Sequence, residues 1–184
     1  MAKTESNEFK VGKIAPDFNL MNTVDDKHYA LNDLKGNKGT LIMFICNHCP
    51  FVIHVNEELI KMANEYQNKG IRFIAISSND VVNYPQDAPH LMKKLAHDLA
   101  YPFPYLYDET QNIAKAYDAA CTPDFYLFDG DLKSVYHGQI DDSRPENGKS
   151  VTGKDMRKAM DNLLQHKSIL ENQKPSIGCG IKWK

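Results

Sequence analysis

The chain has 184 residues and a net charge of −2 at pH 7, with 42% hydrophobic and 25% charged residues. This length and composition are typical of one soluble globular domain with a buried core. The nearly balanced charge argues against nucleic acid or an anionic membrane surface as the main partner. The chain also lacks the run of about 18 apolar residues that a membrane-spanning helix needs.

The ends of the chain differ from its middle. Residues 1–12 contain no apolar segment of the kind found in secretory signals, so we expect a loose lead-in and a cytoplasmic protein. Residues 13–170 carry the patterns of one domain, and residues 171–184 form an irregular C-terminal tail with Cys179. Four cysteines are too few for a disulfide-built scaffold and point to redox or metal chemistry.

The domain opens with short alternating patterns of polar and apolar residues. Residues 15–20 predict a strand, residues 22–27 a turn, and residues 28–31 the second strand of a hairpin. The continuous apolar run at residues 41–45 predicts a central strand that is covered on both faces.

A helical pattern follows from about Cys49. Apolar residues recur on one helical face up to Tyr66, and Gly70 provides a stop. Residues 71–76 then predict a second buried strand. Strand, helix and strand therefore form a βαβ unit, whose strands we expect to be parallel with a right-handed crossover.

The second half of the domain contains shorter elements. We expect Asp87 to cap a helix with Pro89 in its first turn and with Leu91, Leu95 and Leu99 on its buried face. The other predicted elements are a strand at residues 105–108, a brief helix at 110–117, a hairpin at 124–128 and 133–140, and a last helix from Thr152.

The stretch Cys46-Asn47-His48-Cys49-Pro50 carries the chemistry, because it lies where the buried strand meets the helix. Such a position lowers a thiol pKa from about 8.5 into the range ~3.5–7.5. We expect Cys46 at the exposed end as the nucleophile, and Cys49 deeper, where it resolves a mixed disulfide. Asn47, His48 and Pro50 are expected to tune the pair, and His48 to favour the thiolate.

Other interpretations of the thiols stay open. A Cys-x-x-Cys is also half of a zinc site, and thiolates with His48 suit zinc or copper(I), so a cysteine-based metal-binding module is an alternative. The preferred interpretation assigns no metal and no cofactor. Cys121 and Cys179 are possible auxiliary thiols, and each is either inert or a third redox partner.

Several segments carry a family resemblance. They are Ala15-Pro16-Asp17-Phe18, Cys46-Asn47-His48-Cys49-Pro50, Thr122-Pro123 before a strand, and Phe128-Asp129-Gly130 at a hairpin. Over about residues 12–170 the chain resembles the thioredoxin-like superfamily, in its branch of peroxiredoxin-like, AhpC/TSA-related redoxin domains. The resemblance implies an α/β fold: a three-layer sandwich with a central mixed β-sheet flanked by helices, and an N-terminal β-hairpin extension.

The resemblance also implies an active site. Thr122 and a cis Pro123 pack beside Cys46 and Cys49 in such a fold, and contact the substrate. Two features differ from thioredoxins: Ile45 stands where they usually carry tryptophan, and residues 41–45 lack the acidic residue that serves many of them as a buried proton acceptor.

Motif and resemblance together predict a thiol-disulfide oxidoreductase that works by dithiol–disulfide exchange. The alternative is a peroxiredoxin-like thiol peroxidase with Cys49 as its peroxidatic cysteine. This alternative is weaker because Cys46 stands where peroxiredoxins carry a threonine, and no obvious arginine precedes the strand at Phe125. The expected partners are a protein or small-molecule disulfide and a cellular thiol or reductase as electron donor, with neither nucleic acid nor membrane. We expect a monomer or weak dimer.

Overall fold

The computed structural model describes residues 3–169 and 173–184. The predicted boundary between the domain and the tail, at residues 170 and 171, lies outside these residues. Within the described ranges, no helix is both long and apolar enough to cross a membrane.

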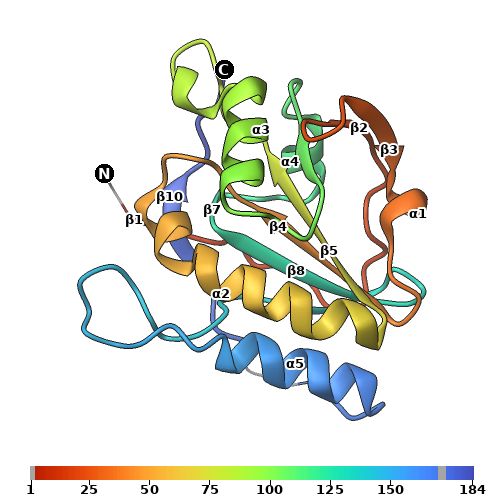
Figure 1. Cartoon of the computed structure of the whole chain (residues 1–184). Coiled ribbons are helices and arrows are strands. Elements are labelled where there is room, and N and C mark those ends of the chain that lie inside the picture. The colour runs from red at the N-terminus through yellow and green to blue at the C-terminus, as the bar shows by residue number, and fades with distance from the viewer. Residues whose placement is uncertain (1–2, 170–172) are drawn as a thin grey trace.

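A mixed sheet forms the centre of the described part of the chain (Figure 1). Its seven strands are β2 Asn19–Asn22, β3 Lys27–Ala30, β4 Gly39–Phe44, β5 Ile71–Ser77, β6 Tyr105–Tyr107, β8 Asp124–Asp129 and β9 Ser134–His137. They lie in the order β3-β2-β6-β5-β4-β8-β9. β5 runs parallel to both β4 and β6, whereas the other neighbours are antiparallel, which makes the sheet mixed as predicted.

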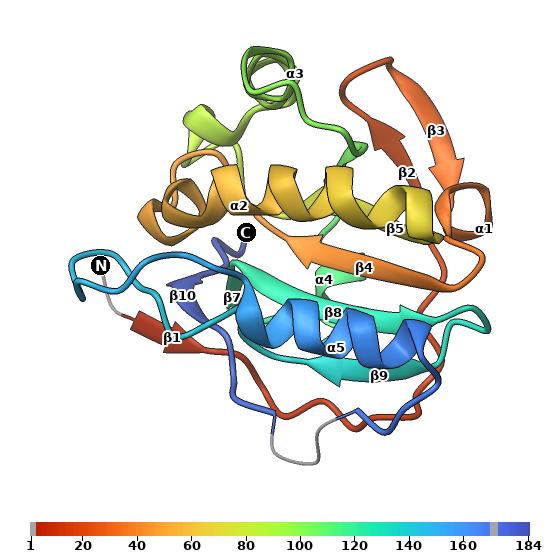
Figure 2. The same cartoon turned by 60° about the horizontal axis from the view of Figure 1, so that its bottom comes forward.

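Helices cover both faces of this sheet. They are α1 Leu31–Leu34, α2 Pro50–Tyr66, α3 Pro89–Asp98, α4 Asn112–Ala116 and α5 Lys154–Leu164, with 3₁₀ turns at Gln67–Lys69 and Pro85–Asp87. Leu41 and Met43 of β4 pack with α2, α3 and α5, whereas the alternate residues Ile42 and Phe44 pack with α1 and α4. Figure 2 shows α2 and α5 over one face. The predicted three-layer sandwich is confirmed, and β2 and β3 form its N-terminal hairpin.

The predicted strand–helix–strand unit consists of β4, α2 and β5. Pro50 occupies the first turn of α2, where the missing backbone N–H is not needed. Gly70 ends the 3₁₀ turn after α2 with φ +97°, a conformation that glycine adopts without strain. β4 therefore leads the chain directly to the N-terminus of α2, at the edge where β5 also ends.

The prediction of the buried face of α3 is wrong. Met92 and Ala96 are buried, whereas Leu91 and Leu95 are only partly buried and Leu99 is 37% exposed. Both stripes repeat every four residues and lie one residue apart. The structure buries the stripe with the smaller Ala96, which lets the helix approach the sheet more closely.

A second sheet joins both ends of the chain. Its described strands are β1 Lys3–Glu5, β10 Ile177–Gly180 and β7 Cys121–Thr122, with β10 in the middle and antiparallel to both neighbours. The segments expected to be a loose lead-in and an irregular tail therefore contain strands. No local pattern marks them, because their hydrogen bonds go to partners far away in the sequence.

Candidate active site

The Cys-x-x-Cys lies between the end of β4 and the start of α2. The cis peptide bond Thr122-Pro123 lies beside it. The Sγ of Cys46 is 3.5 Å from the Thr122 hydroxyl, and the Cys49 thiol donates a hydrogen bond of 3.1 Å to the Thr122 carbonyl. The structure therefore brings together the residues that the resemblance paired: Cys46, Cys49, Thr122 and Pro123.

The expectation that Cys46 lies at an exposed end is wrong. Cys46 is 1% exposed and Cys49 is fully buried, and both carry free thiols. The Thr122 hydroxyl and the half-buried His48 ring lie next to the Cys46 sulfur. A disulfide can therefore reach Cys46 only after part of this cover moves.

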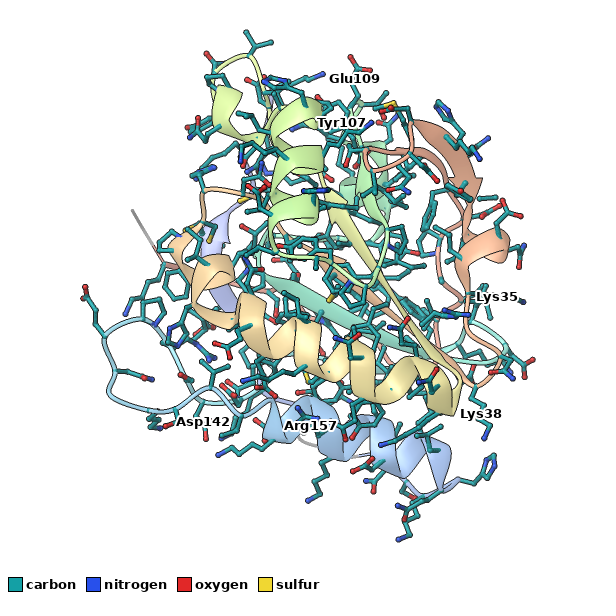
Figure 3. The ribbon with its side chains drawn as sticks, viewed as in Figure 1. Lys35, Lys38, Tyr107, Glu109, Asp142 and Arg157 are labelled. Atoms are coloured by element: carbon teal, nitrogen blue, oxygen red, sulfur yellow. The ribbon has the colours of Figure 1, made fainter. Side chains whose placement is uncertain are left out.

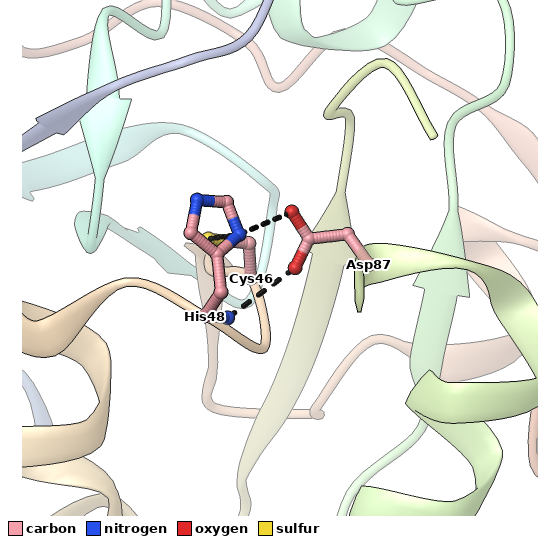
Figure 4. Close-up of side chains that lie close together, drawn as sticks. All are labelled: Cys46, His48 and Asp87. Carbon is pink, nitrogen blue, oxygen red and sulfur yellow. Dashed lines mark hydrogen bonds and ion pairs between the residues drawn. The ribbon is translucent and has the colours of Figure 1, made fainter. Parts of the chain in front are cut away.

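A buried carboxylate organises the loop between the two cysteines. Oδ1 of Asp87 accepts hydrogen bonds from the backbone N–H groups of Asn47 and His48, at 2.8 and 3.3 Å. Its Oδ2 accepts from Nδ1 of His48 at 2.7 Å (Figure 4). The same oxygen also accepts from the Asn79 amide at 2.8 Å. The prediction that Asp87 caps α3 is wrong, because Ala88 is the N-cap and the Asp87 carboxylate is held by the cysteine loop.

Asp87 also fixes the His48 ring. Since Nδ1 lies 2.7 Å from the carboxylate, an N–H at this position donates to it and holds the ring in place. The Cys46 Sγ is 4.0 Å from Nδ1, and the Tyr84 ring stacks on the imidazole with centroids 5.8 Å apart. Asp87, His48 and Cys46 thus form a row of neighbouring polar groups.

Asn47 and Pro50, the other two residues expected to tune the thiols, shape the loop and the helix start around them. The Asn47 side chain donates to the Gln86 carbonyl at 2.9 Å and accepts from the Tyr105 hydroxyl at 3.1 Å, so it ties the cysteine loop to its surroundings. Pro50 provides the first turn of α2. Neither side chain is hydrogen-bonded to a sulfur.

The surroundings move the pKa values of the two thiols in opposite directions. The hydrogen bond from Cys46 lowers the pKa of Cys49, helped by hydrogen bonds from Cys179 and from the Val52 backbone in the first turn of α2. The same thiol–thiol hydrogen bond, burial and the charge of Asp87 raise the pKa of Cys46. The lowered pKa was expected at Cys46, and the structure assigns it to Cys49, because the hydrogen bond between the two thiols favours the charged form of Cys49, while burial and the Asp87 charge disfavour that of Cys46.

The two possible auxiliary thiols lie close by and are buried. The Cys121 thiol donates to the Pro123 carbonyl over 3.6 Å, and burial raises its pKa. Cys179 of β10 is 2% exposed and packs in the same core cluster as Cys46 and Cys49. Of these two thiols, Cys179 is the one whose interaction helps to lower the pKa of Cys49.

A set of atoms at this site could also bind a metal ion. The Cys46 sulfur, His48 Nδ1 and an Asp87 oxygen all lie within 4.8 Å of one another, and sulfur, nitrogen and oxygen are all ligands that zinc accepts. A metal would have to replace the proton in the 2.7 Å contact between His48 and Asp87. The geometry is accounted for by hydrogen bonds alone.

Comparison with known proteins identifies the family. The sequence model described as the AhpC/TSA family matches residues 11–137. The chain belongs to the AhpC/TSA family. Thiol-disulfide oxidoreductase ResA of Geobacillus thermodenitrificans is 26% identical over 143 residues, which cover 74% of this chain and 75% of ResA. The chain thus resembles a thiol-disulfide oxidoreductase at low identity.

Solved structures share the fold. An uncharacterized conserved protein from Geobacillus kaustophilus is 61% identical, with a TM-score of 0.98 over 100% of this chain and 97% of its own. The thioredoxin domain of a thiol-disulfide oxidoreductase from Bacteroides vulgatus is 20% identical, with a TM-score of 0.60 over 76% of this chain and 92% of its own. The predicted thioredoxin-like fold is therefore confirmed.

Sequence reasoning missed Asp87 and Asn79. A signal was present, because the carboxyl ends of parallel strands meet at one edge of a sheet. Cys46 follows β4, and the polar residues 77–80 end and follow β5, the strand parallel to β4. The pairing of the two strands therefore places residues 77–80 near the thiols. No sequence pattern of this kind predicts that Asp87 lies at the same edge of the sheet.

Proposed function

We propose that this AhpC/TSA-family protein is a thiol-disulfide oxidoreductase that cycles between a Cys46–Cys49 dithiol and its disulfide. The observation that carries the proposal is the pair itself: two thiols beside the start of α2 both contact Thr122, and their pKa values are moved in opposite directions. Its likeness to ResA and to the thioredoxin domain of a thiol-disulfide oxidoreductase supports this choice.

The reaction uses the shared proton. When the proton passes from Cys46 to Cys49, the Cys46 thiolate attacks a substrate disulfide, and one substrate sulfur leaves as a thiolate. That thiolate takes the proton from Cys49, and the Cys49 thiolate then attacks the Cys46 sulfur. A Cys46–Cys49 disulfide forms, and the second substrate sulfur leaves as a thiolate. Two electrons have moved from the protein to the substrate. The Thr122 hydroxyl, 3.5 Å from the Cys46 sulfur, can stabilise the thiolate in the first step.

The proposal includes the partners and the compartment expected from the sequence. The substrate is a protein or small-molecule disulfide, and a cellular thiol or reductase returns the protein to its dithiol form. Reduction fits a cytoplasmic location, where thiols are kept reduced. The chain would act as a monomer or weak dimer.

The test measures the reduction of insulin disulfides with dithiothreitol as donor. Cys46→Ser should abolish catalysis, because the attacking sulfur is gone. Cys49→Ser should accumulate a mixed disulfide on Cys46 that gel electrophoresis detects without reductant. Cys121→Ser is the matched control and should keep catalysis, since its thiol is turned to the Pro123 carbonyl. Trapping that persists when Cys46 and Cys49 are both serine would contradict the proposal.

One observation favours a second candidate, a thiol peroxidase. The pKa of Cys49 is lowered, which favours the thiolate, the form of a cysteine that attacks peroxide. Stopped-flow mixing with peroxide decides between the two. The exchange enzyme reacts at the rate of an ordinary thiolate, whereas a peroxidase reacts orders of magnitude faster and loses this rate in Cys49→Ser.

A further inference from the structure

The backbone of β10 is in close contact with the backbone of Thr122 and Pro123. Its pairing with β7 places Cys179 opposite Thr122 and Gly180 opposite Cys121. A Cβ on Gly178 would lie 2.0 Å from the Thr122 carbonyl oxygen, so only glycine fits there. The glycine before Cys179 therefore allows the strand to bring this cysteine to the active site.

Cys49 consequently has two cysteines near it, Cys46 of its own loop and Cys179 of β10. Its own thiol reaches the carbonyl of Thr122 at 3.1 Å, and Thr122 is the residue opposite Cys179. Cys46, Cys49 and Cys179 belong to one buried cluster, and an interaction with the Cys179 thiol helps to lower the pKa of Cys49. The Cys121 thiol is instead turned to the carbonyl of Pro123.

We propose that Cys179 is a third reacting thiol, which moves the disulfide from Cys46–Cys49 to Cys49–Cys179. This inference rests on the proposed function and deepens it. Deprotonated Cys179 attacks the Cys49 sulfur; the Cys49–Cys179 bond forms and the Cys46–Cys49 bond breaks. The bonding electrons leave on Cys46, which becomes a thiolate. The number of disulfides stays at one, so the step needs no further oxidant or reductant.

The transfer changes what the site presents. Cys46 regains a nucleophilic sulfur while the protein is still oxidised, so it can form a mixed disulfide with a partner. At the same time β10 becomes covalently tied to the start of α2. The backbone that follows β10 is also fixed, because the Lys182 N–H donates to the Asn79 side chain at 2.8 Å and Asn79 donates to Asp87.

The test locates the disulfide in the full-length protein. The reduced chain is equilibrated in glutathione buffers of graded potential, quenched in acid, alkylated and digested with trypsin. Cys46 and Cys49 fall in the peptide 39–61, Cys121 in 116–133 and Cys179 in 168–182. A disulfide within 39–61 reports Cys46–Cys49, whereas a link between 39–61 and 168–182 reports the transferred bond.

We expect both species in the oxidised wild-type protein. Cys46→Ser should convert the whole disulfide population to the link between 39–61 and 168–182. Cys179→Ser should remove this link and keep the disulfide within 39–61. Cys121→Ser is the matched control, and it should retain both species.

Two results would overturn the inference. One is a folded Cys46→Ser variant that keeps Cys49 and Cys179 as free thiols at potentials where the wild type is oxidised. The other is an oxidised wild type with no link to 168–182, which decides the matter even if Cys46→Ser does not fold. A wild type that forms no disulfide within 39–61 and shows no catalysis would instead contradict the proposed function.

Discussion

Carboxylates make contacts at two places, in the cysteine loop that precedes α2 and along α2 itself, but their surroundings differ. At the N-terminus, the fully buried Asp87 accepts four hydrogen bonds around the cysteine loop. Further along α2, Glu58 and Glu65 pair with Arg157 of α5. Figure 3 shows Arg157 where α5 faces α2. The buried group has no water to replace a lost partner, whereas the partly exposed pairs do. Equal changes of charge at the two places therefore have unequal consequences.

The largest effect is expected for Asp87→Asn. The amide cannot accept all the hydrogen bonds of the carboxylate, so the free energy of unfolding should fall by about 3 kcal/mol. Loss of the negative charge beside Cys46 should also lower the pKa of Cys46, because Asp87 raises it. Urea unfolding and thiolate absorbance measure the two effects.

Glu65→Gln is the control for this change, since it removes one negative charge from the exposed part of α2. It should leave the thiol titration unchanged. An Asp87→Asn protein with an unaltered thiol titration would show that Asp87 has only a structural role.

The pH dependence of stability tests the charge on Cys49. An unfolded thiol titrates near about 8.5, and the folded Cys49 has a lowered pKa. Between the two values the unfolded chain binds more protons, so the stability of the reduced protein should rise with pH. Above about 8.5 the slope should reverse, because the raised pKa values of Cys46, Cys121 and Cys179 keep protons on the folded chain.

Urea unfolding of the reduced protein across this pH range measures the effect. Cys49→Ser should lose the rising limb and keep the falling one. A rising limb of unchanged size in this variant would place the charge elsewhere.

A smaller effect is expected for Thr122→Val. The change keeps the shape of the side chain and removes the hydroxyl 3.5 Å from the Cys46 sulfur. The pKa of Cys46 should rise, and exchange should slow about fivefold, as the loss of about 1 kcal/mol implies. Thr40→Val is the matched control, because the Thr40 hydroxyl accepts a hydrogen bond from the Gly36 N–H at the other end of β4. Equal slowing in both variants would argue against a role for the Thr122 hydroxyl.

The smallest effect is expected for Arg157→Met, which keeps most of the side-chain length. Its ion pairs are partly exposed, so stability should fall by about 0.5 kcal/mol, and less at high salt. The Cys46–Cys49 reduction potential should stay the same. A shift in this potential would mean that the ion pairs of Arg157 are energetically coupled to the cysteine loop.

Local patterns predicted the fold well where they coincide with burial. The apolar run at β4, the stripe of α2 and the stop at Gly70 specify a strand–helix–strand unit without knowledge of the rest of the chain. The α3 stripe was predicted wrongly because two stripes compete and packing against the sheet decides between them.

The site was predictable only in part, for the same physical reason. The motif identifies the cysteine loop, and the resemblance adds Thr122 and Pro123. The burial of Cys46, the Asp87 carboxylate and the arrival of β10 all depend on residues that are distant in sequence. Such contacts leave no periodic trace, because the pairing of remote backbones determines them.

The central place of β10 bears on how the protein is handled in the laboratory. The Lys184 N–H donates to the Gln111 side chain at 2.9 Å, and β1 pairs with the other edge of β10. An affinity tag or a fluorescent protein fused to residue 1 or residue 184 would therefore be attached next to the sheet that contains Cys121 and Cys179. Redox measurements on such fusions would report the tag as well as the protein. The exposed loop at residues 146–150 offers a more neutral place for a label.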